Sequence, residues 1–124
     1  MDSNHVDPVE GDIYRVVREP EFTALFMLGA DDSAETVENV DAELRLPDGT
    51  RWSATFMTLG AIETVMRRWR ETGEYGGGVF FQCSDLVIVP KGGVAAMVEA
   101  FRAIVAEGPQ GTLAKGCPVT AGRR

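Results

Sequence analysis

The 124-residue chain is 44% hydrophobic and 25% charged, and its formal net charge is −7. One domain with one core fits this length and apolar content, which excludes a wholly disordered acidic chain. No apolar run approaches the about 20 residues of a membrane-spanning helix, and the acidic N-terminus is unlike a signal peptide, so we expect a cytoplasmic protein without membrane contact. Two cysteines, Cys83 and Cys117, are too few for a disulfide framework, and reduced thiols are expected.

The charge is divided unevenly along the chain. Residues 1–49 hold 13 Asp and Glu against three Arg, whereas residues 50–124 hold six Asp and Glu against nine Lys and Arg. Residues 31–43 include no basic residue, and such a surface repels nucleic-acid phosphates, so no nucleic-acid partner is expected. It could attract a basic protein, and a loop that only adds solubility is the alternative. The candidate partner-binding residues are Asp31, Asp32, Glu35 and Glu38.

The first elements are a disordered N-terminal segment, two strands and a loop. Residues 1–12 have the composition of a disordered segment, and residues 13–17 predict a short edge strand. Residues 21–28 (EFTALFML) place aromatic and large apolar side chains on both alternating faces, a pattern typical of a central strand covered on both sides. Residues 29–39 read as a polar loop.

The clearest pattern is a β-hairpin. Residues 40–46 alternate strictly between polar and apolar side chains. Residues 47–50 (PDGT) combine a proline that presets φ with a glycine that accepts a positive φ, as a tight turn requires. Alternation resumes through residues 51–57, so two antiparallel strands are expected. The apolar face of the first strand comprises Val40, Ala42, Leu44 and Leu46, and that of the second comprises Trp52, Ala54 and Phe56.

A helix and two strands come next. Thr58 stands where an N-cap is needed, and Gly73 supplies the C-terminal stop. Three glycines at residues 76–78 predict a flexible connection, and residues 79–83 and 86–89 predict strands, the latter without a polar face. The apolar stripe of the helix comprises Leu59, Ile62, Val65, Met66 and Trp69.

A second helix follows a break at Pro90. Gly108 and Pro109 end it, and residues 109–124 lack periodicity and predict a loose tail. Its apolar stripe comprises Val94, Met97, Val98, Phe101, Ile104 and Val105.

These elements predict a single α+β domain over residues 13–108. The order is (β)-β-β-β-α-β-β-α, with an antiparallel or mixed sheet of about five strands and both helices packed on one face. The strand at residues 21–28 is apolar on its second face as well, so the terminal segments or a partner subunit should cover that face, and a homodimer is one expectation.

The chain lacks residues that common chemistries need. Its one histidine, His5, falls in the expected disordered N-terminal segment, whereas Ser-His-Asp and Cys-His units need a rigidly held imidazole. No set of Cys and His has the spacing of a zinc site, and the acidic loop lacks the spacing of a calcium loop. We therefore expect no catalytic residue, no metal and no cofactor.

Two minor candidate sites remain. Lys91, Gly92 and Gly93 lie between a strand and a helix, where free amides and a lysine could hold an anion; an ordinary strand-to-helix turn is the alternative. A pocket between sheet and helices is the other candidate. A buried carboxylate there could have a raised pKa and act as a general acid or base, whereas a turn-capping aspartate is the alternative. The candidate pocket residues are Trp52, Tyr75 and Asp85.

Three segments carry a resemblance. They are residues 52–55 (WSAT), residues 72–74 (TGE) and residues 80–89 (FFQCSDLVIV). Together they resemble a group of small uncharacterised bacterial proteins, over about residues 40–107. The resemblance implies that this range is the structural unit, and it implies no activity. The size and acidity also look like those of immunity proteins that neutralise toxins, without a matching motif.

The sequence thus favours a non-enzymatic protein–protein interaction module that binds a basic partner, in an immunity-like role. A small-molecule-binding protein or minor enzyme with the pocket described above is the first alternative. A homo-oligomeric structural subunit is the second.

Overall fold

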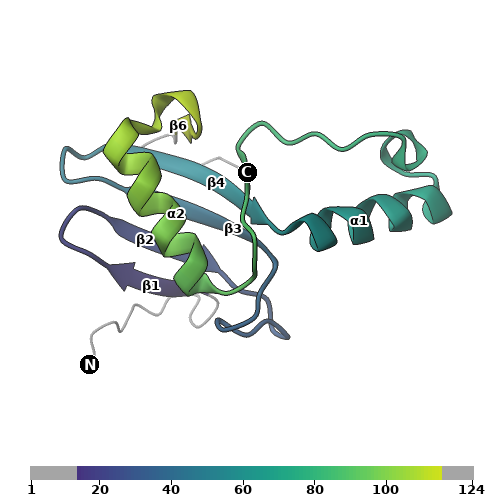
Figure 1. The fold of residues 1–124 in the computed structure, drawn as a ribbon, viewed down its shortest axis with the longest axis horizontal. Coiled ribbons are helices and arrows are strands. Elements are labelled where there is room, and N and C mark those ends of the chain that lie inside the picture. Colours follow the sequence, from purple (N-terminus) through teal and green to yellow (C-terminus); the bar gives the residue numbers. More distant parts are fainter. Residues whose placement is uncertain (1–13, 116–124) are drawn as a thin grey trace.

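A computed structural model describes residues 14–115, and its elements form an α+β fold (Figure 1). The expected disordered segment at residues 1–12 and the end of the expected tail, from residue 116, lie outside the described residues. In chain order the elements are β1 (Tyr14–Arg18), β2 (Thr23–Met27), β3 (Asn39–Arg45), β4 (Arg51–Met57), α1 (Leu59–Thr72), the 3-10 turn η1 (Tyr75–Gly78), β5 (Leu86–Ile88), α2 (Val94–Glu107), the 3-10 turn η2 (Pro109–Gly111) and β6 (Ala114–Lys115).

The sheet is mixed, as predicted. Strands β1 to β4 pair in sequence order and antiparallel, β5 runs parallel to β4 near Phe56, and β6 pairs antiparallel with β4 at Trp52 and Ser53. The predicted hairpin is confirmed, with Leu44 opposite Trp52. Its turn closes through hydrogen bonds from Leu46 N to Thr50 O at 3.0 Å and from Gly49 N to Leu46 O at 2.9 Å.

The core lies between one face of the sheet and α2. Three aromatic rings from three elements meet there: Phe101 of α2 lies 4.9 Å from Phe56 and 6.0 Å from Phe26, measured between ring centroids. All three side chains are buried, and so are Met97 and Val98 on the same side of α2. The predicted apolar stripe of the second helix is therefore the face that closes the core.

The first helix does not pack on the sheet, contrary to the expectation that both helices cover one face. No residue of α1 is buried, and Figure 1 shows the helix projecting from the end of β4, beyond the sheet. Trp69, at the C-terminal end of its apolar stripe, packs instead on the segment that follows the helix: its ring lies 4.7 Å from Tyr75 and 5.6 Å from Phe81. Helix α1 and residues 73–83 thus form a projecting unit, which we call the arm.

The prediction of a strand at residues 79–83 is wrong, because no strand forms there. The observed order is therefore β-β-β-β-α-β-α-β. Residues 79–81 are a short apolar run, a pattern that predicts a buried strand. The structure uses one of them, Phe81, to stack on Trp69 of α1, with an interplanar angle of 13°. The sheet resumes only at β5, which is three residues long.

Strand β2 is covered on one face only among the described residues. Ala24 and Phe26 are buried under α2, whereas Met27 on the opposite face is 42% exposed and Leu25 is half-buried. The predicted cover over this second face, by terminal segments or a partner subunit, stays a prediction.

Residues 109–115 are not the loose segment that was expected. Leu113 and Pro109 are buried, and β6 extends the sheet beside β4. Lys115 lies over the Trp52 ring, 5.7 Å from its centroid. The segment shows no periodicity because its contacts come from single residues: the buried Pro109 and Leu113 and the two paired residues of β6.

Candidate functional site

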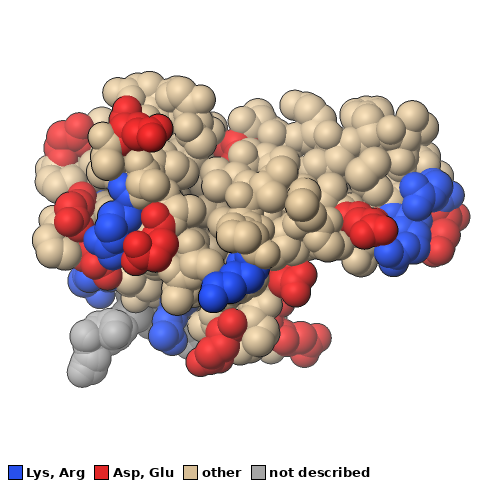
Figure 2. All heavy atoms as spheres, viewed as in Figure 1, with Lys and Arg blue, Asp and Glu red and all other residues tan. Residues whose placement is uncertain are grey.

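The arm and the sheet edge at its base carry the most exposed of the large apolar side chains in the described chain. They lie along η1, along the return to β5, and at the base of the arm where it meets the body. Figure 2 shows that the side of the arm that faces the viewer is almost free of charged side chains, which gather at its outer end. The exposed residues are Val79 (80%), Leu59 (68%), Tyr75 (67%), Phe80 (57%) and Ile88 (49%).

A strained turn holds the arm in shape. Tyr75 has a φ of 46°, and the three glycines after it also have positive φ. Such a φ is unfavourable for an aromatic residue and persists only where the surroundings enforce it. Here the Tyr75 ring packs on Trp69, and a Cβ at Gly78 would overlap the Met66 carbonyl oxygen. The predicted flexible connection at residues 76–78 is therefore a close-packed turn against α1.

A hollow of about 520 Å³ lies in the crook where the arm leaves the body. Exposed Leu59 and Ile88 line it, with Glu38 and Lys91 contributing one charge of each sign. At its base Thr58 accepts a hydrogen bond from Ala61 N at 3.1 Å, which confirms the predicted N-cap. The Thr58 hydroxyl donates to the Glu38 carboxylate at 2.8 Å, so the cap also connects the arm to the body.

The four acidic candidates lie together in one loop, and all four are exposed. Figure 2 shows acidic side chains along the lower edge of the view, where Figure 1 places this loop, beside the base of the arm. Asp32 accepts a hydrogen bond from Gly29 N at 2.8 Å. Glu35 accepts one from the Ser33 hydroxyl at 2.7 Å, and this bond lowers the pKa of Glu35. Three of the four carboxylates, Glu38 included, therefore also hold the local fold.

Two backbone amides at the candidate anion site, those of Gly93 and Val94, are already bonded. Gly93 N donates to Val37 O and Val94 N donates to Ala34 O, each at 2.8 Å. The approach is so close that a Cβ at Gly92 would lie 2.7 Å from Thr36 O. The acidic loop thus caps α2 through its carbonyl groups, which favours the ordinary strand-to-helix turn over an anion site at Lys91, Gly92 and Gly93.

The three candidate pocket residues do not come together. Trp52 is buried on the face of β4 that looks toward α2. Asp85 bonds to Ser53 and Thr55, which point to the opposite face of the same strand. Tyr75 lies on the arm against Trp69. A pocket that contains all three is therefore not formed, because sheet alternation separates two of them and the arm carries the third away.

Asp85 caps a turn and ties it to β4. It accepts hydrogen bonds from Ser53 at 2.9 Å, Thr55 at 3.0 Å and Cys83 at 3.2 Å. Burial alone raises the pKa of Asp85, but the hydrogen bonds from these three donors outweigh it, and the net effect lowers the pKa. The raised pKa considered for a general acid or base is therefore not found, and the turn-capping alternative is favoured.

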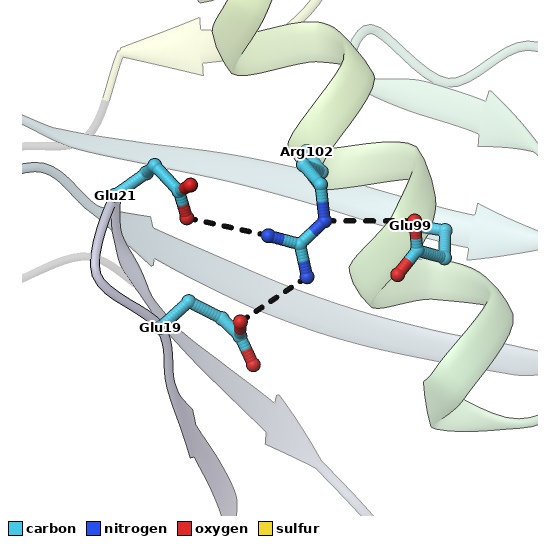
Figure 3. A network of polar contacts seen from close by, with 4 residues as sticks. All are labelled: Glu19, Glu21, Glu99 and Arg102. Carbon is cyan, nitrogen blue, oxygen red and sulfur yellow. Dashed lines mark hydrogen bonds and ion pairs between the residues drawn. The ribbon is translucent and has the colours of Figure 1, made fainter.

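Sequence reasoning missed the exposed side chains Val79 and Phe80, because it placed them in a strand. No local signal distinguishes these two side chains from those of a buried strand. Sequence reasoning also missed a charge network at Arg102, which Figure 3 shows between α2 and the β1–β2 turn. The Arg102 guanidinium lies 3.1 Å from Glu19, 3.2 Å from Glu21 and 3.5 Å from Glu99.

Within residues 14–115, no group of three or more His, Cys, Asp or Glu side chains is placed to hold a metal ion. No helix in that same range has the length and apolarity to cross a membrane. Comparison with known proteins gave no match to a family model, to a curated protein or to a solved structure. The resemblance of residues 40–107 to small bacterial proteins stays a prediction.

Proposed function

We propose that this protein is a non-enzymatic protein–protein interaction module whose contact surface is the arm together with the crook at its base. One observation carries the proposal: a helix and its return segment project from the body with large apolar side chains in solvent. Soluble monomers rarely maintain contiguous exposed apolar surface without a partner for it. The strained turn at Tyr75 supports this, because a rigid projecting element loses little conformational freedom on binding.

The surroundings of the crook fit the usual anatomy of an interface. Leu59 and Ile88 supply an apolar centre, and the acidic loop with Glu38 supplies a charged rim beside it. Interfaces commonly have an apolar, well-packed centre and a polar rim that sets orientation and association rate. The matching partner therefore offers an apolar side chain for the crook and basic side chains around it. A basic toxin or nuclease, bound in an immunity-like role, has this chemistry.

Removing the apolar side chains of the arm tests the proposal. The double substitution Val79→Ser and Phe80→Ser changes two exposed positions, so it should leave folding intact. Native mass spectrometry of wild-type protein captured from host lysate should show a stoichiometric partner that the double variant loses. The matched control is Met27→Ser, which changes an exposed apolar residue on the sheet and should keep the partner. A partner retained equally by all three proteins would refute the arm as the contact surface.

The electrostatic part of the proposal has its own test. Asp31→Asn, Asp32→Asn, Glu35→Gln and Glu38→Gln together remove four negative charges. Each amide keeps an oxygen that can accept the local hydrogen bonds, so the loop should keep its fold. Affinity for the captured partner should fall, and its dependence on salt concentration should become shallower. Unchanged affinity and salt dependence would leave the arm as the binding element and remove the basic partner.

A further inference from the structure

Strand β1 is one edge of the sheet, and the turn after it shows which backbone groups face outward. Glu19 and Phe22 exchange two hydrogen bonds: Glu19 N donates to Phe22 O at 2.8 Å, and Phe22 N donates to Glu19 O at 3.3 Å. Bonded and non-bonded pairs alternate along an antiparallel ladder. The residues of β1 that bond to β2 are therefore Val17 and Arg15.

The other residues of β1, namely Tyr14, Val16 and Arg18, turn their N–H and C=O groups toward the open edge. In the described part of the chain, no strand pairs with this side of β1. A row of free donors and acceptors is a template for another strand. The edge thus has the backbone groups needed to continue the sheet.

The side chains beside this edge follow a charge pattern. Arg15 and Val17 share the face that α2 covers, because they stand opposite the buried Phe26 and Ala24. With Glu19 and α2 they line a groove of about 560 Å³. Side chains of an added strand at the facing positions would lie over this groove. One end of the edge is therefore cationic and the other end anionic, with an aliphatic residue midway.

The anionic end has an excess of negative charge. Three carboxylates, from Glu19, Glu21 and Glu99, surround the one guanidinium of Arg102 (Figure 3). A second cation placed beside Glu19 would reduce this excess, and the open edge is where an incoming strand could supply one.

We propose that β1 pairs antiparallel with β1 of a second copy of this chain. The two-fold axis that relates the copies passes midway between their two Val17 residues. Val16 of each copy then exchanges both backbone hydrogen bonds with Arg18 of the other. Arg15 of each copy stands opposite Glu19 of the other, so two ion pairs flank a contact between the two Val17 side chains. A shift of the register by two residues in one direction would set Arg15 opposite Val17 and lose both ion pairs. The shift in the other direction would set Arg15 opposite Glu21, which lies in the turn beyond the strand. The spacing of charges thus selects this pairing and makes a second copy the matching occupant.

Sedimentation velocity over a concentration series tests this dimer with the full chain. The wild type should convert from monomer to dimer through the micromolar range. Val16→Pro removes an outward N–H that plays no part in pairing with β2, so the fold should persist while the dissociation constant rises at least tenfold. Val16→Thr keeps the N–H and a β-branched side chain and should dimerise like the wild type. Circular dichroism of each variant verifies that it is folded.

A pair of charge reversals tests the register. Arg15→Glu sets two carboxylates opposite each other at both ends of the pairing, and Glu19→Arg sets two guanidinium groups there. Each variant alone should dimerise at least tenfold more weakly than the wild type. An equimolar mixture of the two should recover a heterodimer, because every facing pair is again of opposite sign.

Two results would overturn the proposal. One is a protein that stays monomeric to several hundred micromolar. The other is a dimer that Val16→Pro leaves intact or whose charge-reversed variants fail to recover in the mixture, which would place the contact elsewhere or assign it to another strand. The test is independent of the arm: Val79→Ser with Phe80→Ser should leave this self-association unchanged.

Discussion

Helices α1 and α2 have the same length and opposite roles. Each has 14 residues and a stripe of apolar side chains, and each ends at a glycine. Four residues of α2 are buried against the sheet, whereas none of α1 is. In α1, Trp69 of the stripe packs on Tyr75 and Phe81, which follow the helix closely in the chain. An amphipathic stripe therefore shows that a helix has a packing partner, and it does not identify that partner.

The two helices also differ in how they are attached. At the start of α2, the amides of Gly93 and Val94 are bonded to carbonyl groups of the acidic loop, and further along the helix Arg102 binds Glu19 and Glu21 of the β1–β2 turn. Helix α1 is joined to the body mainly through Thr58 and its bonds to Glu38. A helix attached at one end can serve as a contact element, whereas the one held along its length closes the core.

The largest effect should come from truncating the matched aromatic residues of the two helices. Phe101→Ala leaves a cavity among three packed rings and should lower the free energy of unfolding by about 3–5 kcal/mol. Trp69→Ala removes only contacts within the arm and should lower it by about 1–2 kcal/mol. Urea denaturation followed by far-ultraviolet circular dichroism measures both. Equal losses would mean that α1 belongs to the core after all.

Glycine substitutions sharpen the same contrast. Gly93 has a φ of 104°, and a Cβ there would lie 2.6 Å from Glu35 O, so Gly93→Ala should cost about 1–3 kcal/mol of global stability. Gly78→Ala should instead loosen the arm, because its Cβ would overlap the Met66 carbonyl oxygen. Hydrogen exchange should then quicken in residues 59–83 and stay unchanged in β3. Uniformly faster exchange in the Gly78 variant would show that the arm and the body unfold together.

The attachment of the arm can be weakened at its cap. Thr58→Ala removes the hydrogen bond accepted from Ala61 N and the one donated to Glu38, and should cost about 1 kcal/mol. Limited proteolysis should then cut the arm faster than in the wild type. Glu38→Gln is the control, because its amide oxygen can still accept from Thr58 and cleavage should stay slow. Similar cleavage of both variants would contradict the role of the cap.

Asp85 holds the point where the arm returns to the sheet. Since its pKa is lowered in the folded state, its contribution is present above the ordinary value of 3.8 and is lost as the pH falls through the lowered folded value. Asp85→Asn should cost about 1 kcal/mol at pH 7 and make the loss of stability below pH 4 shallower. Denaturation curves between pH 7 and pH 2 measure this. Asp31→Asn is the control, and a slope altered equally in both would assign the effect to net charge.

Much of the candidate site escaped prediction from the sequence, and the reason is physical. The acidic residues were identified as exposed, since charged side chains rarely become buried unpaired. The apolar residues Val79 and Phe80 were placed in the sheet, because large apolar side chains are usually buried and no local pattern marks the exceptions. The sequence likewise places Leu59 in the apolar stripe of a packed helix and Ile88 in a strand without a polar face, for the same reason.

The sequence by itself determined the elements whose signals are local. The β3–β4 hairpin, the caps at Thr58 and Gly73, and the buried face of α2 all depend on residues within a few positions of each other. Only the tertiary structure decided which surfaces meet: that α1 packs on its own return segment, that Leu113 docks β6 beside β4, and that loop carbonyl groups cap α2. The last two pairings join residues far apart in the chain, and the first depends on how the chain turns back at residues 75–78. Small differences between competing packings select them, and no periodicity in the sequence records those differences.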